Sequence, residues 1–245
     1  YDGRIVICLG TNMRDHKSIS LESHLAHLPL FAGMSASDIE HIASCSKLIH
    51  AEKGDVLFRA GDACTGFHLL VFGQVKLAFT SSQGNEKIVE IIQQGQSFGE
   101  AIMFLDRTYI VFAQALQDSM LIHVPKAAIL NELEHDYEFT RKMLAGLAKR
   151  THDLMTDVEA YSLQSAKQRI IGYLMIDVPQ AAIDSDQLEF ELTAGKGVIA
   201  SRLNITQEHF SRVLHDLSDS GLLEVHGKKI RIPSVSKLLK TQDNP

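Results

Sequence analysis

Four polar side chains near the C-terminal end of the chain have the types and the spacing needed to read a nucleic acid. They recur at intervals of three and four residues, which places them on one face of an α-helix; they are Glu208, Ser211, Arg212 and His215. An Arg can donate two hydrogen bonds to guanine O6 and N7, a Glu can accept one from the cytosine amino group, and a Ser can serve a phosphate or a base edge. A solvated surface has the same periodicity, so spacing alone leaves both interpretations open.

The residues around this face predict two helices separated by a tight turn, at 196–203 and 207–220. Thr206 is placed to cap the second helix, and an acidic residue in its first turn suits the positive end of the helix dipole. An apolar stripe forms a separate face of the helix, made of Phe210, Val213, Leu214 and Leu217. Helix-turn-helix proteins place the N-terminal end of the second helix against base edges. We therefore predict DNA contacts from Thr206, Gln207, Glu208, Ser211 and Arg212.

The flanking segments predict a small winged domain around these two helices. The expected elements are a helix at 166–178, a loop at 179–186 and strands at 188–192, 222–226 and 229–232. The last two strands are joined through Gly227 and Lys228 and form a two-stranded wing. Lys228 at its tip is predicted to contact a DNA phosphate.

The charge distribution permits contact with a polyanion although the whole chain is acidic, with a formal net charge of −6. Residues 165–245 carry ten Lys or Arg and ten Asp or Glu, so their net charge is zero. All the excess acid therefore lies in residues 1–164. Charge does not exclude DNA binding, but it does not suggest it either.

The segment from about 47 to 124 predicts an antiparallel β-roll, so the fold class is α+β. Many short strands at regular spacing are typical of a sandwich or roll. The apolar runs, separated by glycine-containing turns, are 56–58, 67–72, 75–79, 88–92, 111–115 and 120–124. Ahead of the roll, a short helix and a turn precede a second helix at 38–46, which Ser35 or Ser37 would cap.

A long helix at 136–164 is predicted to join the roll to the C-terminal domain. Apolar residues alternate along it at spacings of three and four, which is the pattern of a parallel coiled-coil seam. The seam residues are Leu144, Leu147, Leu154, Val158 and Tyr161, with Thr151 as the polar position. A helix packed on its own domain is the alternative, but so long a helix needs more apolar partner than a small roll offers. We therefore predict a homodimer with an interface formed by Leu144, Leu147, Leu154 and Val158.

These elements divide the chain into an N-terminal extension at 1–24, a sensor roll at 25–135, a dimerisation helix at 136–164 and a winged helix-turn-helix at 165–245. Met13 is a candidate natural start, which would leave residues 1–12 as an added segment. The cysteines are widely spaced and predict free thiols in a reducing cytoplasm; they are Cys8, Cys45 and Cys64. No apolar stretch approaches the roughly 20 residues that span a bilayer.

The sequence resembles the CRP/FNR family of bacterial transcription regulators over essentially residues 25–232. The resemblance rests on stretches of the roll at 53–62, 67–75 and 97–100, and on Glu208-x-x-Ser211-Arg212, which matches the recognition helix of the FNR branch. It implies a roll like the cyclic-nucleotide-binding domain, a double-stranded β-helix. It also implies a dimer that binds double-stranded DNA at an inverted repeat of TTGAT half-sites, with RNA polymerase as a further partner.

The same resemblance implies an effector pocket formed by Phe98, Gly99, Glu100, Tyr109 and Ile110. In members that bind cyclic nucleotides, an Arg-Ser pair holds the cyclic phosphate, because a buried phosphate needs charge-assisted hydrogen bonds. Tyr109 and Ile110 occupy the corresponding positions, so cyclic AMP is not expected. Oxygen-sensing FNR proteins use four cysteines for an iron–sulfur cluster, whereas this chain has three, so that cluster is not expected either.

The segment 100–115 most resembles the DNR subgroup, whose members bind haem and respond to nitric oxide. Haem b is therefore an open alternative, with histidines in or near the roll as candidate ligands: they are His24, His27, His50 and His68. Two other functions stay open, a cyclic-nucleotide-binding module that controls an enzyme or another partner, and a DNA-binding regulator with no ligand. An enzyme on the related cupin roll would need a His/Glu metal cluster on adjacent strands, which these scattered histidines do not supply, so neither a catalytic residue nor a metal site is expected.

Overall fold

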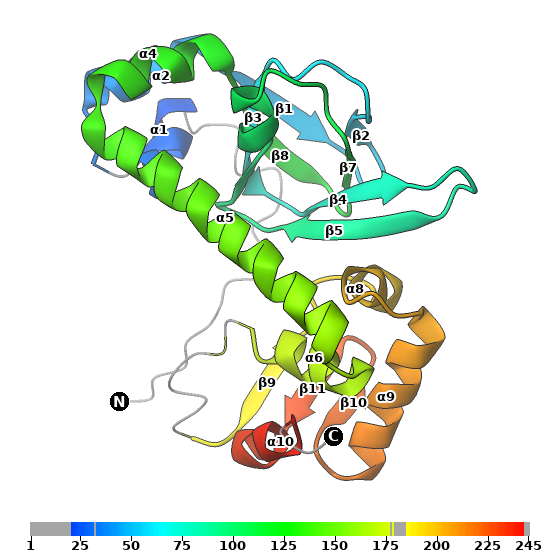
Figure 1. The fold of residues 1–245 in the computed structure, drawn as a ribbon. Helices are drawn as coiled ribbons and strands as arrows, with labels where there is room; N and C mark the ends of the chain where they lie inside the picture. The colour runs from blue at the N-terminus through cyan, green and yellow to red at the C-terminus, as the bar shows by residue number, and fades with distance from the viewer. Residues whose placement is uncertain (1–20, 32, 177, 179–184, 243–245) are drawn as a thin grey trace.

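The computed structural model describes residues 21–31, 33–176, 178 and 185–242. Two bodies, each with its own sheet structure, are joined by one long helix, α5 (Tyr137–Leu163), as Figure 1 shows. The candidate start at Met13, residues 1–12, Cys8 and most of the expected loop at 179–186 lie outside the described residues.

The N-terminal body is a roll of two four-stranded antiparallel sheets, with the strand orders β1-β8-β3-β6 and β2-β7-β4-β5. The six predicted strands are confirmed, and β1 and β6 are additional. The strands are β1 (Lys47–Ala51), β2 (Val56–Phe58), β3 (Gly66–Phe72), β4 (Val75–Thr80), β5 (Glu86–Ile92), β6 (Ser97–Phe98), β7 (Phe112–Ala115) and β8 (Ser119–Pro125). Because β5 is last in its order, one edge of this strand has no strand neighbour in its sheet.

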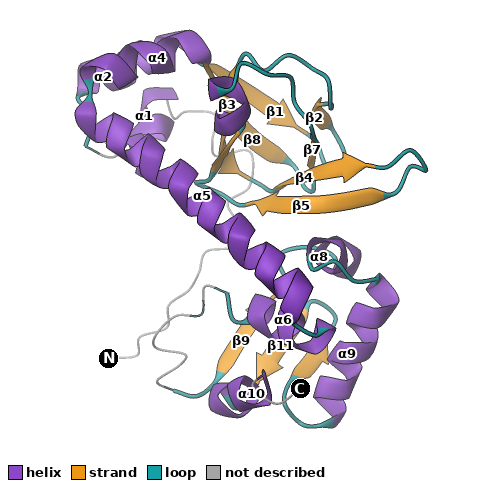
Figure 2. Cartoon of the chain, viewed as in Figure 1, coloured by secondary structure: helices purple, strands orange, loops and turns teal. Residues whose placement is uncertain are grey.

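Two apolar cores stabilise the roll. One lies between the two sheets and includes Phe58, Leu70, Phe98, Tyr109 and Leu121. The other lies between the sheet of β3 and the helices at the end of the roll (Figure 2), and includes Leu25, Phe31, Phe67, Ile122 and Phe139. These helices are α1 (Leu21–Ala26), η2 (Pro29–Phe31), α2 (Ala36–Cys45) and α4 (Lys126–His135). Of the two capping candidates, Ser35 caps α2, since its side chain accepts a hydrogen bond from the Asp38 amide at 3.2 Å.

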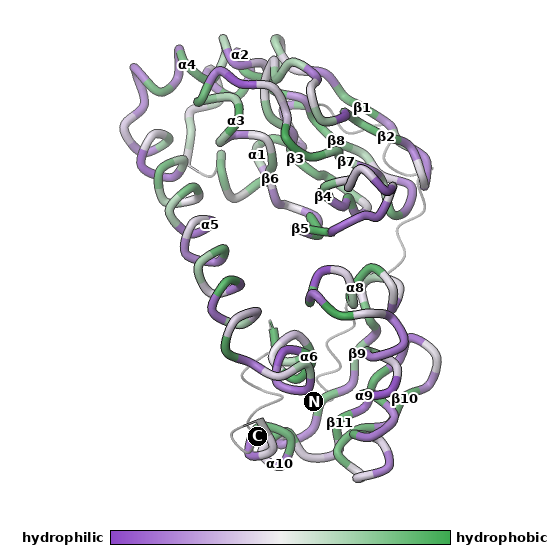
Figure 3. Tube along the Cα trace, turned by 45° about the vertical axis from the view of Figure 1, so that its right-hand side comes forward, coloured by the Kyte–Doolittle hydropathy of each residue, from purple (hydrophilic) through white to green (hydrophobic). Residues whose placement is uncertain are grey.

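The linking helix α5 begins at the predicted place. The Asp136 side chain accepts a hydrogen bond from the Phe139 amide at 2.9 Å and thereby caps the helix. Phe139 and Met143 are buried in the second core, whereas most residues after Met143 are exposed. Figure 3 shows hydrophobic and hydrophilic positions alternating along this exposed length. In the described part of the chain, no helix is both long and apolar enough to cross a bilayer.

The C-terminal body is a winged helix-turn-helix around a single apolar core. Its elements are α6 (Ala166–Leu174), β9 (Leu188–Glu191), α8 (Lys196–Arg202), α9 (Gln207–Asp219), β10 (Glu224–His226), β11 (Lys229–Ile232) and α10 (Val235–Gln242). Three expectations need correction. The first helix ends at Leu174 rather than 178, the wing is a three-stranded sheet because β9 pairs with β11, and α10 is an additional helix.

Candidate nucleic-acid interface and sensor cavity

The turn between α8 and α9 brings the N-terminal end of α9 to the surface. Thr206 caps α9 as predicted, because its Oγ1 accepts a hydrogen bond from the His209 amide at 3.2 Å. Asn204 in the turn has a φ of 57°, a left-handed conformation that Asn adopts more readily than most residues. A Cβ at Gly197 would lie 2.7 Å from Gln207 Oε1, so the glycine lets the Gln207 side chain lie against α8.

The structure brings the predicted reading residues together on one side of α9. Glu208 and Arg212 are exposed, Ser211 is half-buried, and the apolar stripe on the opposite side is buried in the domain core. His215 continues the polar face and pairs with Asp219 at 3.4 Å. The exposed face is therefore free to meet a ligand without disturbing the core.

Lys228 lies on a different element of the same domain. It is exposed in the turn between β10 and β11, where Gly227 has a φ of 66°. Its backbone carbonyl accepts a hydrogen bond from the Leu192 amide at 2.8 Å, which ties the turn to the end of β9. The side chain projects from a fixed backbone and is separate from the face of α9.

Comparisons with known proteins agree with this architecture. The cyclic nucleotide-binding domain family matches residues 48–136, and the Crp-like helix-turn-helix domain family matches residues 168–241. The anaerobic regulatory protein of Aggregatibacter actinomycetemcomitans is 30% identical over 194 residues, which are 77% of this chain and 74% of that protein. The chain belongs to the CRP/FNR family. It is a DNA-binding transcription regulator, as are its relatives, and the winged helix-turn-helix is its DNA-binding domain.

One further relative and two solved structures are also similar to this chain. The fumarate and nitrate reduction regulatory protein of Yersinia pestis is 28% identical over 200 residues, which are 79% of this chain and 78% of that protein. A CooA mutant from Carboxydothermus hydrogenoformans has a TM-score of 0.69 at 20% identity and covers 82% of this chain and 89% of that one. The sensor domain of DNR from Pseudomonas aeruginosa has a TM-score of 0.50 at 30% identity and covers 55% of this chain and 91% of that one.

The five residues expected in the effector pocket of this regulator do not all meet. Phe98 and Tyr109 are buried in the core between the sheets, and the Tyr109 ring stacks on Phe58 with centroids 3.6 Å apart. Gly99 has a φ of 100° and precedes the short helix α3 (Glu100–Phe104). The Ile110 side chain, in contrast, is 60% exposed and faces away from this core.

Among the candidate histidines, only His68 lies in the interior between the sheets. It is 6% exposed, stacks on Phe98 at 5.2 Å and lies edge-on to His123 at 5.0 Å. Its Nδ1 is buried without a hydrogen-bond partner. Burial, followed by the neighbouring His123, lowers the pKa of His68 from 6.5 to about 3. The imidazole is therefore neutral at physiological pH.

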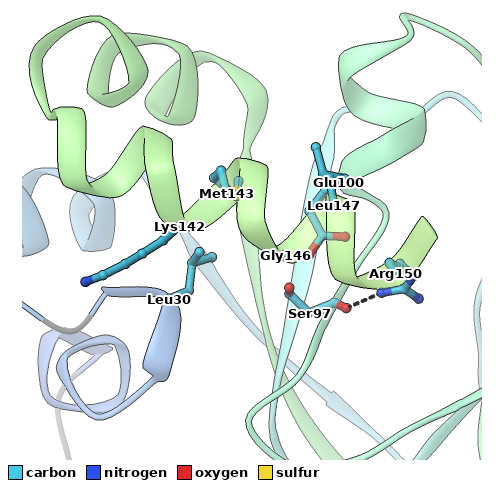
Figure 4. A pocket seen from close by; sticks show the side chains of 8 residues that line it. All are labelled: Leu30, Ser97, Glu100, Lys142, Met143, Gly146, Leu147 and Arg150. Carbon is cyan, nitrogen blue, oxygen red and sulfur yellow. Dashed lines mark hydrogen bonds between the residues drawn. The ribbon is translucent and has the colours of Figure 1, made fainter. Parts of the chain in front are cut away.

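A small cavity lies between α5 and the roll, beside Glu100 (Figure 4). Its volume is about 70 Å³, and it is lined by Leu30, Ser97, Glu100, Lys142, Met143, Gly146, Leu147 and Arg150. Arg150 Nη1 donates a hydrogen bond to the Ser97 carbonyl at 3.0 Å, and its Nη2 forms an ion pair with Glu90 on β5. Burial raises the pKa of the Glu100 carboxyl. Of these polar residues, sequence reasoning found only Glu100.

Neither the small cavity beside Glu100 nor the surroundings of His68 have room for haem in this structure. Pockets for ligands of drug size hold roughly 300–1,000 Å³, whereas the cavity beside Glu100 holds about 70 Å³. The space next to His68 is filled by Phe58, Phe98 and Tyr109. His50 is exposed on β1, and His27 is exposed on the surface beyond α1, where its Nδ1 contacts the Ser23 carbonyl at 2.6 Å. Within the described residues there is also no group of three or more metal-ligating side chains.

The predicted seam residues have different surroundings. Leu144 and Val158 are 62% and 63% exposed, and Leu154 is exposed as well. Leu147 is half-buried and lines the small cavity. Tyr161 is not on the seam, which corrects the sequence interpretation, because its hydroxyl donates a hydrogen bond to the Arg202 carbonyl at 2.6 Å. Of the predicted seam residues, Tyr161 therefore contacts the DNA-binding domain, and the exposed apolar ones end at Val158.

Proposed function

We propose that this regulator binds, as a homodimer, an inverted repeat of TTGAT half-sites under the control of a small effector other than cyclic AMP. The proposed domain boundaries are those expected from the sequence, with a sensor roll at 25–135, a dimerisation helix at 136–164 and a DNA-binding domain at 165–245. The observation that carries the proposal is the exposed polar face of α9, which presents Glu208 and Arg212 above a buried apolar stripe. RNA polymerase is the proposed second partner on the DNA.

In the proposed complex, Arg212 donates two hydrogen bonds to the guanine of the half-site, and Glu208 accepts one from a cytosine amino group. Ser211, Thr206 and Gln207 lie at or near the same end of α9 and contact phosphates or base edges. Lys228 contacts a phosphate from the wing, which adds affinity without sequence information.

The exposed apolar residues of α5 support the homodimer. Leu144, Leu154 and Val158 are large apolar side chains that water contacts in the single chain, and a second copy of the helix would cover them at coiled-coil spacing. A dimer also presents two recognition helices, which an inverted repeat requires.

The proposal that cyclic AMP is not the effector is supported by the surroundings of Tyr109. This residue occupies the place where the resemblance puts a phosphate ligand, and its ring is stacked inside the roll. No Arg-Ser pair is present at 109–110 to neutralise a phosphate.

The proposed readout is tested by a binding titration of Arg212→Ala and Lys228→Ala on three duplexes at two salt concentrations. The duplexes are the palindrome, the same palindrome with the G·C pair of each half-site changed to A·T, and a random sequence. Arg212→Ala should lose roughly 1–3 kcal/mol of discrimination per half-site, mainly at that base pair. Lys228→Ala should weaken all three duplexes alike and reduce the salt dependence. If Arg212→Ala weakens all three duplexes equally, Arg212 is a phosphate contact and the assignment is wrong.

A further inference from the structure

Lys87 on β5 carries a half-buried amine that the proposed DNA contacts do not use. Its Nζ donates a hydrogen bond to the Ser201 carbonyl of α8 at 2.5 Å and lies 5.0 Å from the centre of the Tyr161 ring of α5. Figure 1 shows α8 directly below β5, so the amine lies between the two elements. Its position is therefore fixed by contacts on more than one side.

The groups that face Lys87 from the neighbouring helices are mostly cationic. Arg202 of α8 and Arg169 of α6 both act on it electrostatically, and Asp157 of α5 opposes them. That carboxylate is already engaged, because Arg202 Nη2 forms an ion pair with it at 2.6 Å. The guanidinium carbon of Arg169 lies 5.9 Å from the centre of the Tyr161 ring, and its buried Nε has no hydrogen-bond partner among the described residues. Lys87 therefore belongs to a cluster with more positive than negative charge.

The acidic residues of β5 itself are paired with other cations. Glu86 forms an ion pair with Lys76 of β4, and Glu90 forms one with Arg150 of α5. Each of these carboxylates thus has a cation of its own. The excess positive charge around Lys87 is therefore not cancelled by its own strand.

The surroundings of Lys87 disfavour its protonated form. Burial, followed by the nearby Arg202, lowers the pKa of Lys87 from 10.5 to about 8. At pH 7.5 about one quarter of such amines are neutral, against roughly 0.1% of amines with a pKa of 10.5. A neutral amine keeps two N–H donors, so one can still serve the Ser201 carbonyl while the lone pair is available for reaction. Desolvated lysines and lysines beside another cation are those that proteins use as nucleophiles.

The amine can also be reached from solvent. Lys87 and Glu86 line an open groove of about 450 Å³ between β5 and the turn that joins α8 to α9. The other lining residues carry neither an amine nor a thiol; they are Gly197, Ser201, Asn204, Ile205, Thr206 and Gln207. Ligand sites of drug size have comparable volumes, so a small reagent has room to approach Lys87.

We propose that Lys87 is a site of covalent acylation, at which a small acyl phosphate that enters the groove transfers its acyl group to Nζ. The amine lone pair forms a C–N bond with the carbonyl carbon, the bond between that carbon and the phosphate oxygen breaks, and inorganic phosphate leaves with the proton that the nitrogen loses. An anionic donor is favoured by the combined charge of Lys87, Arg169 and Arg202. The product is a neutral amide, so the step also removes one charge from a crowded cationic cluster. The proposal depends on neither the operator nor the effector.

The first experiment compares the acylation rates of two lysines. The full chain is incubated with acetyl phosphate at pH 7.5 without DNA, and acetylation is followed by peptide mass spectrometry. Lys87 should be acetylated roughly tenfold faster or more than Lys53, an exposed lysine of the same roll. In concentrated urea the two rates should become nearly equal, because only the folded chain surrounds Lys87 with other groups. Equal rates in the folded protein would overturn the proposal.

The second experiment tests the cause of the reactivity. The rate at Lys87 should rise with pH and level off above about pH 8, where the amine is mostly neutral. Arg169→Met removes a neighbouring cation, so the pKa of Lys87 should rise and its acetylation at pH 7.5 should slow about twofold or more. Arg141→Met, at an exposed position near the start of α5, is the matched control and should leave the rate unchanged. A rate that still rises at about pH 9.5 in the wild type, or an unchanged rate in Arg169→Met, would contradict activation of Lys87 by this cluster.

The third experiment tests the class of donor. With p-nitrophenyl acetate, a neutral ester, the ratio of acetylation at Lys87 to that at Lys53 should be lower than with acetyl phosphate, because only the phosphate is attracted by the positive charge. Added salt should reduce the ratio for acetyl phosphate and leave the ratio for the ester unchanged. Equal ratios for both donors at low salt would overturn the assignment of an anionic donor.

Discussion

The buried histidine of the roll makes a prediction about acid stability that can be worked through in numbers. In the folded chain the pKa of His68 is lowered from 6.5 to about 3 by burial and by His123. The His68 imidazole therefore binds a proton near pH 6.5 in the unfolded chain, but only near pH 3 in the folded chain. Folding stability should fall as the pH is lowered through this window, since the unfolded state binds more protons there.

The expected size follows from the same values. At pH 5, protonation of a group with an unfolded pKa of 6.5 favours the unfolded state by about 2 kcal/mol, and at pH 7.5 by less than about 0.1 kcal/mol. His68→Phe should abolish this difference while keeping a ring between Phe58 and Phe98. The variant should also be more stable than the wild type at pH 7.5, because a buried polar atom without a partner costs roughly 1–3 kcal/mol.

The assay is urea unfolding of the wild type and His68→Phe at several pH values between 5 and 7.5, where most carboxyl groups are already ionised. The unfolding free energies should diverge by about 2 kcal/mol across this range. His123 is half-buried, and burial lowers its pKa too, so His123→Phe should flatten the same curve less. If His68→Phe and the wild type lose stability in parallel, His68 is not a buried neutral imidazole.

Two further predictions concern assembly and the effector. Leu154→Glu puts a charge in the proposed seam of α5. Sedimentation at micromolar concentration should then show monomers, and operator binding should be greatly weakened. A wild-type chain that is itself monomeric yet binds the palindrome would contradict the proposed seam. Cyclic AMP should change neither the melting temperature nor the operator affinity, because Tyr109 fills the position of a phosphate ligand. Saturable binding of cyclic AMP at micromolar concentration, measured by calorimetry, would contradict this assignment of the pocket.

The sequence predicts elements well where local pattern and tertiary packing agree. The Thr206 cap and the stripe of Phe210, Val213, Leu214 and Leu217 obey helical spacing, and the structure buries that stripe as expected. β1 was not found because most of its residues are exposed and it lacks an apolar run. β6 has two residues, which is too short for any periodicity to register.

The site residues that the sequence did not predict correctly depend on contacts between distant segments. Tyr161 has the spacing of a seam residue, but a hydrogen bond with Arg202, 41 residues away, turns it toward the DNA-binding domain. Arg150 reads as an ordinary surface residue of a helix until β5 brings Glu90 to it, 60 residues distant. Only the family resemblance places Ile110 in the effector pocket, and nothing in its apolar side chain indicates that it lies outside the core.

The edge position of β5 has a consequence for the behaviour of the protein in concentrated solution. On this edge the Ile88 amide donates a hydrogen bond to Ser201 Oγ on α8. Without α8, this amide and its neighbours would form an open β-edge, which is a template for pairing with another chain. Acidic and basic side chains along this strand, Glu86, Lys87 and Glu90, are the kind of charge that discourages such pairing. Neutralising these charges should therefore make the protein more prone to aggregate at high concentration.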